Sequence, residues 1–422
     1  MSIVAIAVFL VVILLIMTEK VHRTTAAWVG AVVLLLTGVL DFDAALSYID
    51  FNTLGVLIGM MAFVAVVRKS GLFEYVAIKA AKLAKGDPWK IMIAFTIVTA
   101  LLSGVLDNVT TVLLVGPMTI TIAQILEEDP VPFLLPEIFA SNVGGTATLI
   151  GDPPNIMIGS AAGLSFMDFL TNTGFAVVFI MIGLILFLNF RYKKNVELGS
   201  DHAGRVMSLD ENKSVTNWPL LKKSIIITVL VIFGFIFHDK LGVESSVIAL
   251  TAAGLILLIG KEDVTEAIQG VEWTTILFFA SLFVVVGGLS ETGVIDKLAN
   301  VLLDATAGHP VVTMMVLLWA SAFISSVLDN IPFIATLIPL VLAMGESGVD
   351  ISSLWWAISL GVCLGGNGTL IGASANVVLS DISTRHGYPI TFQSYLKVGM
   401  PFMILSICIS TVYVLVRYVA LA

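Results

Sequence analysis

The chain has 422 residues, of which 58% are hydrophobic and 12% are charged, and its formal net charge is -9. Soluble domains carry about 25% charged residues, so this composition argues against a soluble enzyme and predicts a protein of the lipid bilayer. The two cysteines, Cys363 and Cys408, lie in separate apolar segments. They provide neither a disulfide framework nor the three thiolates that capture a soft metalloid.

The first half of the chain is a series of apolar segments. Three predicted spans come first, followed by an amphipathic stretch suited to the membrane interface, a run interrupted by polar residues, a run broken by Gly and Pro, and a last span. No basic region precedes the first segment and no small-residue cleavage site follows it, so it is interpreted as a span and not a signal peptide. The predicted bounds are Ile3–Met17, Thr25–Leu40, Thr53–Val67, Phe73–Lys85, Trp89–Leu126, Pro132–Gly163 and Gly174–Phe190.

The second half repeats this order after a linker at residues 199–223. Each half has five full crossings and one interrupted hairpin, and an odd number of crossings inverts the second half relative to the first. We therefore predict an all-α polytopic membrane protein with inverted-topology repeats at 1–198 and 224–422, about ten transmembrane helices, two re-entrant hairpins and two broken helices. The segments of the second half are Ser224–Phe237, Ser246–Gly260, Thr274–Gly288, Val311–Gly345, Leu354–Ser380 and Gly399–Val416.

The basic residues support this topology. They cluster in Arg68–Lys90 and in Arg191–Lys223, which places both loops on the cytoplasmic side. The first loop aligns with the acidic segment Glu291–Val312 of the second half, which should face outside. Opposite sides for equivalent loops agree with inverted repeats.

An Asp-Asn pair interrupts the apolar sequence once in each half. The stretches Ala100–Thr119 and Ala322–Val341 align at a spacing of 222 residues and place one pair on the other. An ionisable side chain in a membrane segment costs about 2.5 to 3.5 kcal/mol on insertion scales, so we expect these pairs to bind substrate or ions at two hairpin tips near the membrane midplane. The alternative interpretation makes each Asp a helix cap at a short external turn. The candidate residues of the tips are Asp107, Asn108, Thr110, Asp329 and Asn330.

The broken runs carry the segments SNVGGTATLIGDPPN and LGGNGTLIGASAN. Their glycines let the backbone unwind, which exposes carbonyl groups to a cation and half-helix N-termini to an anion, although close helix packing is the alternative reason for the glycines. The two segments align at a spacing of 221, which gives Asp152 the counterpart Ala373, so Asp152 is either a coupling carboxylate for protons or sodium or a cap after a turn. The candidate binding residues are Asn142, Gly145, Thr146, Thr148, Asp152, Asn155, Gly366, Asn367, Thr369 and Asn376.

At these motifs the sequence resembles the ion transporter superfamily, in particular the branch of arsenical pump membrane proteins, D-type sodium/proton antiporters and the pigmentation P protein. The stretches VLDNVTTVLLVGP and VLDNIPFIATLIP stand where the related sodium/divalent-anion symporters carry Ser-Asn-Thr tips, and GGTATLIGDPPN resembles their GGTGTL-type broken helix. The resemblance covers nearly the whole chain. It implies an elevator-like or rocking transporter in which two tips and two unwound helices enclose a central site.

The tips also depart from the symporter pattern. An Asp replaces the first Ser of each tip, and Val109 or Ile331 replaces the Thr. Two ionised carboxylates beside a site would repel a dicarboxylate or a phosphate. The departure therefore favours a neutral or a cationic substrate.

The leading hypothesis for function is proton-coupled, secondary active efflux of arsenite or antimonite, because arsenous acid is neutral at neutral pH. Sodium/proton antiport is the second hypothesis and sodium-coupled symport of an anion or dicarboxylate is the third. An ion channel is the alternative from another functional class, although inverted repeats with broken helices favour alternating access. An enzyme is not expected, because the sequence has no catalytic constellation, metal-ligand spacing or nucleotide motif.

No cofactor and no resident metal are expected, and H⁺ or Na⁺ would be the coupling ion. The expected partners are a small inorganic ion or neutral metalloid, the lipid bilayer, a second copy of the chain and a separate ATPase subunit. Nucleic acid is not expected as a partner. The expected location is the plasma membrane, as a multi-pass protein.

Overall fold

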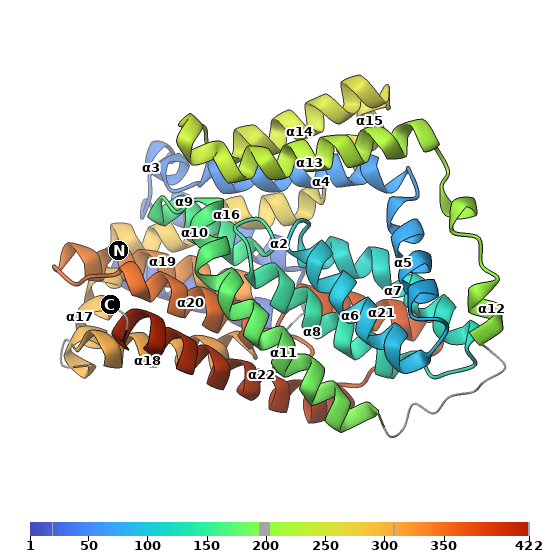
Figure 1. The fold of residues 1–422 in the computed structure, drawn as a ribbon. Helices are drawn as coiled ribbons and strands as arrows, with labels where there is room; N and C mark the ends of the chain where they lie inside the picture. The colour runs from blue at the N-terminus through green and yellow to red at the C-terminus, as the bar shows by residue number, and fades with distance from the viewer. Residues whose placement is uncertain (19, 194–202, 307–308, 421–422) are drawn as a thin grey trace.

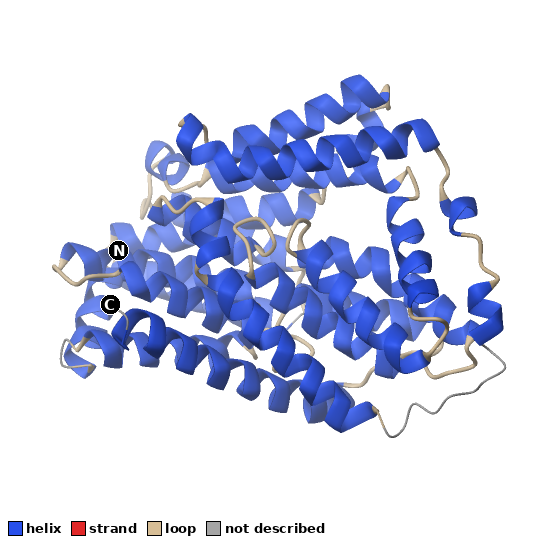
Figure 2. Ribbon diagram, viewed as in Figure 1, coloured by secondary structure: helices blue, strands red, loops and turns tan. Residues whose placement is uncertain are grey.

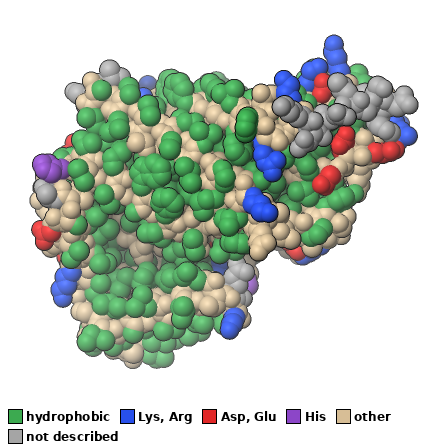
Figure 3. All heavy atoms as spheres, turned by 90° about the horizontal axis from the view of Figure 1, so that it is seen from below, with side chains coloured by type: hydrophobic (Ala, Val, Ile, Leu, Met, Phe, Trp, Pro, Cys, Tyr) green, Lys and Arg blue, Asp and Glu red, His purple; other side chains and the backbone are tan. Residues whose placement is uncertain are grey.

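A computed structural model describes residues 1–18, 20–193, 203–306 and 309–420 of the chain. Every regular element in these ranges is a helix (Figures 1 and 2). Among the described residues, six helices have at least 18 residues and enough apolar character to cross a bilayer, and shorter apolar helices accompany them. Hydrophobic side chains cover most of the face in Figure 3, whereas charged ones are few and lie mostly toward its rim. The prediction of an all-α polytopic membrane protein is confirmed.

The helices of the first half follow the predicted order, with two additional short helices, α3 and α10. Asp41 begins α3 because its carboxylate accepts a hydrogen bond from the Ala44 N–H at 2.7 Å, which satisfies a free donor at the helix start. In chain order the helices are α1 (Ser2–Thr18), α2 (Arg23–Leu36), α3 (Phe42–Ser47), α4 (Phe51–Arg68), α5 (Leu72–Leu83), α6 (Pro88–Ser103), α7 (Asn108–Ile125), α8 (Val131–Thr146), α9 (Pro153–Ala162), α10 (Phe166–Thr171) and α11 (Thr173–Tyr192).

The second half has the same succession of long helices. Its helices are α13 (Trp218–Leu241), α14 (Ser245–Gly260), α15 (Val264–Gln269), α16 (Trp273–Glu291), α17 (Val294–Ala305), α18 (Pro310–Ser325), α19 (Asn330–Glu346), α20 (Ser352–Gly365), α21 (Ser374–Arg385) and α22 (Phe392–Leu415), extended by η2 (Val416–Ala420). Adding 222 to the bounds of α3, α5 and α6 gives those of α15, α17 and α18. The internal repeat is therefore visible in the helix boundaries.

The linker differs in part from the prediction. The predicted boundaries at residues 198 and 199 lie outside the described residues, and the described part of the linker contains α12 (Ala203–Met207) and η1 (Glu211–Ser214). The predicted span Ser224–Phe237 is too short, because α13 already begins at Trp218. The Asn217 side chain caps it by accepting from the Leu220 N–H at 3.0 Å, and Pro219 suits a first helical turn.

The packing of the helices also repeats. α4 packs on α14 while α2 packs on α16, and α7 packs on α21 while α19 packs on α9. Each half thus completes its contacts with the other half, as a two-fold relation between repeats produces. The opposite orientation of the halves across a membrane stays a prediction.

Two groups of helices position the site. We call α1–α4 and α13–α16 the frame helices, and α6–α9 and α18–α21 the site helices. Within the frame, α4, α13 and α14 lie together along the upper face in Figure 1. The site helices pack on one another through α6 with α8 and α18 with α20, and α5 leads from the frame into α6 and α7.

The breaks in the site helices are where the sequence predicts them. α6 is separated from α7 by residues 104–107, and α18 from α19 by 326–329. α8 is separated from α9 by 147–152, and α20 from α21 by 366–373, so that loops interrupt helices near the centre of Figure 2. Pro153 and Pro154 contribute to the first of these breaks because proline has no N–H to continue a helix.

Two glycines beside the breaks serve close packing, as the alternative interpretation of the glycines proposed. A Cβ added at Gly144 would lie 2.1 Å from the Ala100 carbonyl oxygen, and one at Gly365 would lie 2.5 Å from the Ala322 carbonyl oxygen. A backbone atom cannot avoid a new methyl group by changing rotamer, as a side chain can. These glycines therefore set how closely α6 approaches α8 and α18 approaches α20.

We predict that Gly365→Ala destabilises the protein by about 1 to 3 kcal/mol, because the new methyl group must push two helix backbones apart. The matched control is Gly254→Ala in α14, where a Cβ meets nothing within 4 Å. The control should be neutral or slightly stabilising, because alanine is the better helix former. Thermal unfolding in detergent measures both variants, and equal midpoints would contradict the close-packing role.

Candidate functional site

The two Asp-Asn tips lie at the starts of α7 and α19, and both aspartates are N-caps. Asp107 accepts from the Thr110 N–H at 2.8 Å and from the Thr110 hydroxyl, and Asp329 accepts from the Ile331 N–H at 3.1 Å. Capping explains why each helix begins there, because a carboxylate satisfies a free N–H at a helix start. The cap interpretation is thus right about the local bonds. It is wrong about an external turn, because both tips lie among the site helices and face the frame.

The tips meet at a small cavity of about 30 Å³ between frame and site helices. Asp107 and Asn108 of the first tip and Asn330 of the second line it, together with Asp152 from the break before α9. The frame contributes residues that the sequence did not single out. These are Arg23 at the start of α2 and Glu272 and Thr275 at the start of α16.

Arg23 is the cation of this site. Its Nη1 lies 3.3 Å from Asp329 Oδ2 and donates to Ser374 Oγ at 2.8 Å, and its guanidinium lies over the Phe278 ring. Ser374 in turn donates to Asp329 at 2.9 Å, so the second tip, α21 and the frame are joined. Thr275 donates to Glu272 at 3.0 Å.

Carboxyl groups outnumber cations around the cavity. Asp107, Asp152, Glu272 and Asp329 lie in or beside it, against the single guanidinium of Arg23. Among the described residues, no group of three or more His, Cys, Asp or Glu side chains could hold a metal ion. The carboxyl groups are therefore spread around the cavity and do not converge on one position.

Asp152 does not cap α9, so the cap interpretation of this residue is wrong. Its side chain makes no capping bond. Its Oδ1 instead accepts from Asn330 Nδ2 at 3.2 Å, while its Oδ2 is buried without a partner among the described residues. An unpartnered buried carboxyl oxygen at a cavity is an acceptor ready for a cation or a proton.

A cluster of amides lies behind the first tip. Asn142 accepts from Asn108 Nδ2 at 3.2 Å and donates to the side-chain oxygens of Asn367 and Asn376, both at 3.0 Å. The cluster joins the first tip, α8 and the second broken segment. The Asn367 amide nitrogen is buried without a partner among the described residues, which leaves a neutral donor for a ligand.

Several predicted site residues hold the loops instead of facing the cavity. Asn155 donates to the Thr148 carbonyl at 2.9 Å, and Asn376 donates in the equivalent way to the Thr369 carbonyl at 3.0 Å. The Thr148 hydroxyl donates to the Gly104 carbonyl at 2.6 Å, and the Thr369 hydroxyl donates to the Ser326 carbonyl. These bonds tie each broken segment to a tip.

The remaining predicted residues also have supporting positions. The Thr146 hydroxyl donates to the Asn142 carbonyl at 2.7 Å within α8. A Cβ at Gly145 would lie 2.6 Å from the Gly151 carbonyl oxygen, and one at Gly366 would lie 3.0 Å from Ala373 Cβ. Thr110 lines a separate cavity of about 250 Å³.

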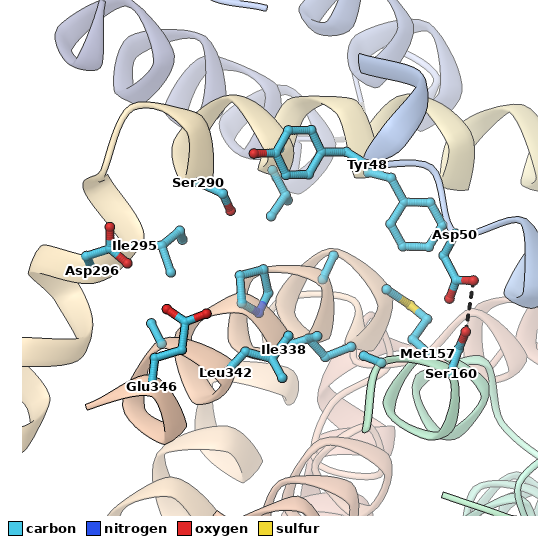
Figure 4. A pocket seen from close by; sticks show the side chains of 17 residues that line it. Tyr48, Asp50, Met157, Ser160, Ser290, Ile295, Asp296, Ile338, Leu342 and Glu346 are labelled. Atoms are coloured by element: carbon cyan, nitrogen blue, oxygen red, sulfur yellow. Dashed lines mark hydrogen bonds between the residues drawn. The ribbon is translucent and has the colours of Figure 1, made fainter. Parts of the chain in front are cut away.

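Larger cavities flank the site. One of about 320 Å³ extends from Arg23, Asp329 and Ser374 toward His22 at the α1–α2 turn. Another, of about 450 Å³, lies between α16 and α19 and contains Asp50 (Figure 4). The 450 Å³ cavity and the 250 Å³ cavity occupy equivalent positions in the two repeats, because their linings correspond at a spacing of 222, as in Phe283 and Met61.

Tyr48 borders the 450 Å³ cavity just before the start of α4. Burial raises the pKa of its hydroxyl to about 12, and its hydrogen bond to Glu291 at 2.9 Å adds to this effect. The hydroxyl therefore stays protonated at neutral pH and continues to donate to Glu291. This bond holds the α3–α4 junction on the end of α16.

Arg23 and Glu272 were missed because each stands at the start of a helix, where a charged residue is ordinary. Two signals could have found them. α2 has only 14 residues, so its first residue lies deeper than the end of a full span. Glu272 aligns with Asp50 in the repeat register, which marks both as repeated acidic positions.

Comparison with known proteins identifies similar chains. Residues 13–361 match a family described as citrate transporter (CitMHS). An uncharacterized transporter of Mycobacterium tuberculosis is 41% identical over 430 residues, covering 100% of both chains. The human P protein is 33% identical over 99% of this chain and 60% of its own length. The YdaH transporter of Alcanivorax borkumensis has the same fold, with a TM-score of 0.62 and 16% identity over 89% of this chain and 88% of that one.

Proposed function

Because this chain belongs to the citrate transporter (CitMHS) family, we propose that it is a secondary active transporter that exchanges a small substrate for H⁺ or Na⁺ at the cavity between the tips. Its multi-pass helical fold and its transporter relatives support a carrier in place of an enzyme. The observation that carries the proposal is the excess of carboxyl groups around the cavity. Buried carboxyl groups are where membrane transporters bind and release coupling cations.

The substrate we propose first is a small neutral metalloid hydroxide, arsenite or antimonite, carried outward in exchange for protons. The amide cluster around Asn142 supports it, because neutral donors and acceptors suit a neutral hydroxide. The Asn367 amide provides a donor without a partner among the described residues. A multiply charged anion is harder to place beside four carboxyl groups.

A second candidate is an organic anion such as the citrate of the family description. One observation favours it: the cavity of about 320 Å³ is lined by Arg23 together with His22 and Ser374. A guanidinium is the side chain that binds carboxylates with two parallel hydrogen bonds. Such an anion would need a cation bound with it to offset Asp329.

Sodium/proton antiport uses the same carboxyl groups and needs no substrate at the amide cluster. In that case Asp152, Asp107 and Asp329 would carry one cation in each direction. A channel would use the same groups without alternating access. These functions are distinguished by what moves and against which gradient.

The deciding experiment uses inside-out vesicles that contain the protein. We expect saturable arsenite accumulation when the lumen is acidic, and its loss with a protonophore or in vesicles lacking the protein. Citrate accumulation in place of arsenite would establish the second candidate, and sodium-driven proton movement alone would establish antiport. Unitary currents in a planar bilayer, or no movement of any of these solutes, would overturn the proposal.

We also propose the plasma membrane as the location, because efflux of a toxic metalloid requires the outer boundary of the cell. A second copy of the chain and a separate ATPase subunit are the proposed protein partners. Purification in mild detergent with light scattering tests the dimer. Co-purification from the native membrane tests the ATPase subunit.

A further inference from the structure

Arg23 belongs to a frame cluster that has an equivalent in the other repeat. At a spacing of 222, Arg23 corresponds to Ser245, Glu272 to Asp50, and Thr275 to Thr53. Both clusters are formed at the start of a frame helix, α16 in one case and α4 in the other. They differ in charge, because only the first contains an arginine.

The two clusters contact the site helices at different levels. The first reaches the second tip, through Arg23 with Asp329, and the start of α21, through Arg23 with Ser374. The second reaches the far end of α9, where Ser160 Oγ donates to Asp50 Oδ1 at 2.9 Å (Figure 4).

The helix contacts show the same difference. In the first repeat α4 packs on α9. The counterparts of these two helices are α16 and α21, but α16 packs on α19. Pro153, at the start of α9, is the counterpart of Ser374, and seven residues separate it from Ser160. Seven helical residues extend about 10 Å, so the frame meets the two repeats at levels about 10 Å apart. The two repeats are similar in sequence but contact the frame differently. This indicates a second state of the protein in which each repeat makes the contacts that the other makes now.

If the first cluster took the contacts of the second, and the second those of the first, Arg23 would gain a new partner. At the spacing of 221 that aligns the broken segments, the counterpart of Ser160 is Asp381, on the far half of α21, where it now pairs with Arg385 at 2.7 Å. If the first cluster took the level that the second now has, Glu272 would meet Asp381, because their counterparts Asp50 and Ser160 are bonded. Arg23 would lie beside both carboxylates, because its counterpart Ser245 and Ser160 share the Asn52 amide as donor. Asp329 would then lie beside Asp50, the counterpart of Glu272.

We propose that Arg23 exchanges Asp329 for Asp381 when the protein changes between its two access states, and that it neutralises the site in one state only. The inference rests on the proposed transport function and names the groups that couple it. With Arg23 beside Asp329, the guanidinium offsets one carboxylate of the cavity. After the exchange, Asp50, Asp107, Asp152 and Asp329 remain without it, so this state requires a bound coupling cation.

At the new position Arg23 would lie between two carboxylates, Glu272 and Asp381, and would offset their repulsion. The Asp381 side chain is 52% exposed and its present partner is the exposed Arg385, four residues away on the same helix. Such a surface pair is weak, so Asp381 can accept Arg23 with little loss. Serine at position 245 cannot make the reciprocal exchange, which makes the exchange a property of the first cluster alone.

Disulfide crosslinking of the full chain in vesicles tests the inference without any substrate. In a background with Cys363→Ala and Cys408→Ser, the pair Asn52→Cys and Ser160→Cys reports the present state, because these side chains approach to 3.4 Å. The equivalent pair, Thr274→Cys and Asp381→Cys, reports the exchanged state. We expect the first pair to crosslink readily and the second pair more slowly, because Asp381→Cys removes the partner proposed for Arg23.

Charge variants are then added to the first pair. Arg23→Gln should slow its crosslinking about fivefold and Asp381→Asn should speed it about fivefold, as expected for a modest coupling energy. Arg23→Lys should behave like the parent, and Arg191→Gln, at the end of α11, is the matched control for loss of an arginine. The crosslinking rate of each variant is compared with that of the parent pair and is scaled to the amount of inserted protein. A variant that folds poorly therefore lowers the amount of protein and does not change the rate.

Unchanged crosslinking rates of the first pair with Arg23→Gln and Asp381→Asn would overturn the inference. Failure of the proposed function has a different signature. Crosslinking would then respond as expected while vesicles move none of arsenite, citrate or sodium.

Discussion

Replacing Asp329 with Asn should reduce transport by about 100-fold, because it removes the carboxylate that faces Arg23 and that we propose to bind the coupling cation. Losing one partner of a largely buried ion pair costs about 3 kcal/mol or more, which corresponds to about 100-fold in an equilibrium constant. Asn caps a helix as well as Asp does, so the start of α19 should persist. Initial rates in inside-out vesicles, scaled to the amount of inserted protein, measure the effect.

The chain offers a matched control for this substitution. Asp41 is also an N-cap, at α3, and Asp41→Asn changes a cap carboxylate that does not line the cavity. We expect nearly parental transport for this control and a loss like that of Asp329→Asn for Asp107→Asn. Full transport by both tip variants would contradict the role of the tips in cation binding.

Asn142→Leu should have the largest effect on stability. It leaves the Asn108 amide and the side-chain oxygens of Asn367 and Asn376 without the partner that each now has. An unsatisfied buried polar group costs about 1 to 3 kcal/mol, so a total of about 3 to 5 kcal/mol is expected. Thermal unfolding in detergent should show a midpoint lower by about 3 to 6 °C.

The control is Cys363→Ala, at the position that corresponds to Asn142 in the second repeat. The Cys363 thiol lies 3.6 Å from Asn155 Oδ1 and is a weak donor, so its loss should cost less than about 1 kcal/mol. Equal midpoints for the two variants would show that the amide cluster does not stabilise the site helices. A stable Asn142→Leu protein without transport would instead assign the cluster to the substrate.

The interruptions could be predicted because they are local features of the sequence. A carboxylate and an amide in an apolar run, or two prolines after glycines, break a helix wherever the chain folds. Their repetition at a spacing of 222 then identified the two tips as equivalent. The roles of individual residues were less accessible. Asn155 and Thr148 looked like ligands, but they bond to the backbone of the breaks, since an amide or hydroxyl in a loop can serve either purpose.

The sequence by itself determined that this is a helical membrane protein of two repeats and where its helices break. Hydropathy, proline and internal alignment are enough for this, because each acts within one segment or between aligned segments. Only the tertiary structure decided which polar groups meet: Arg23 with Asp329, and Asn142 with Asn376. It also decided that two repeats of similar sequence contact the frame at different levels. Such choices depend on how helices distant in the chain pack together, and nearly uniform apolar helices do not specify in their sequence which neighbour each will face.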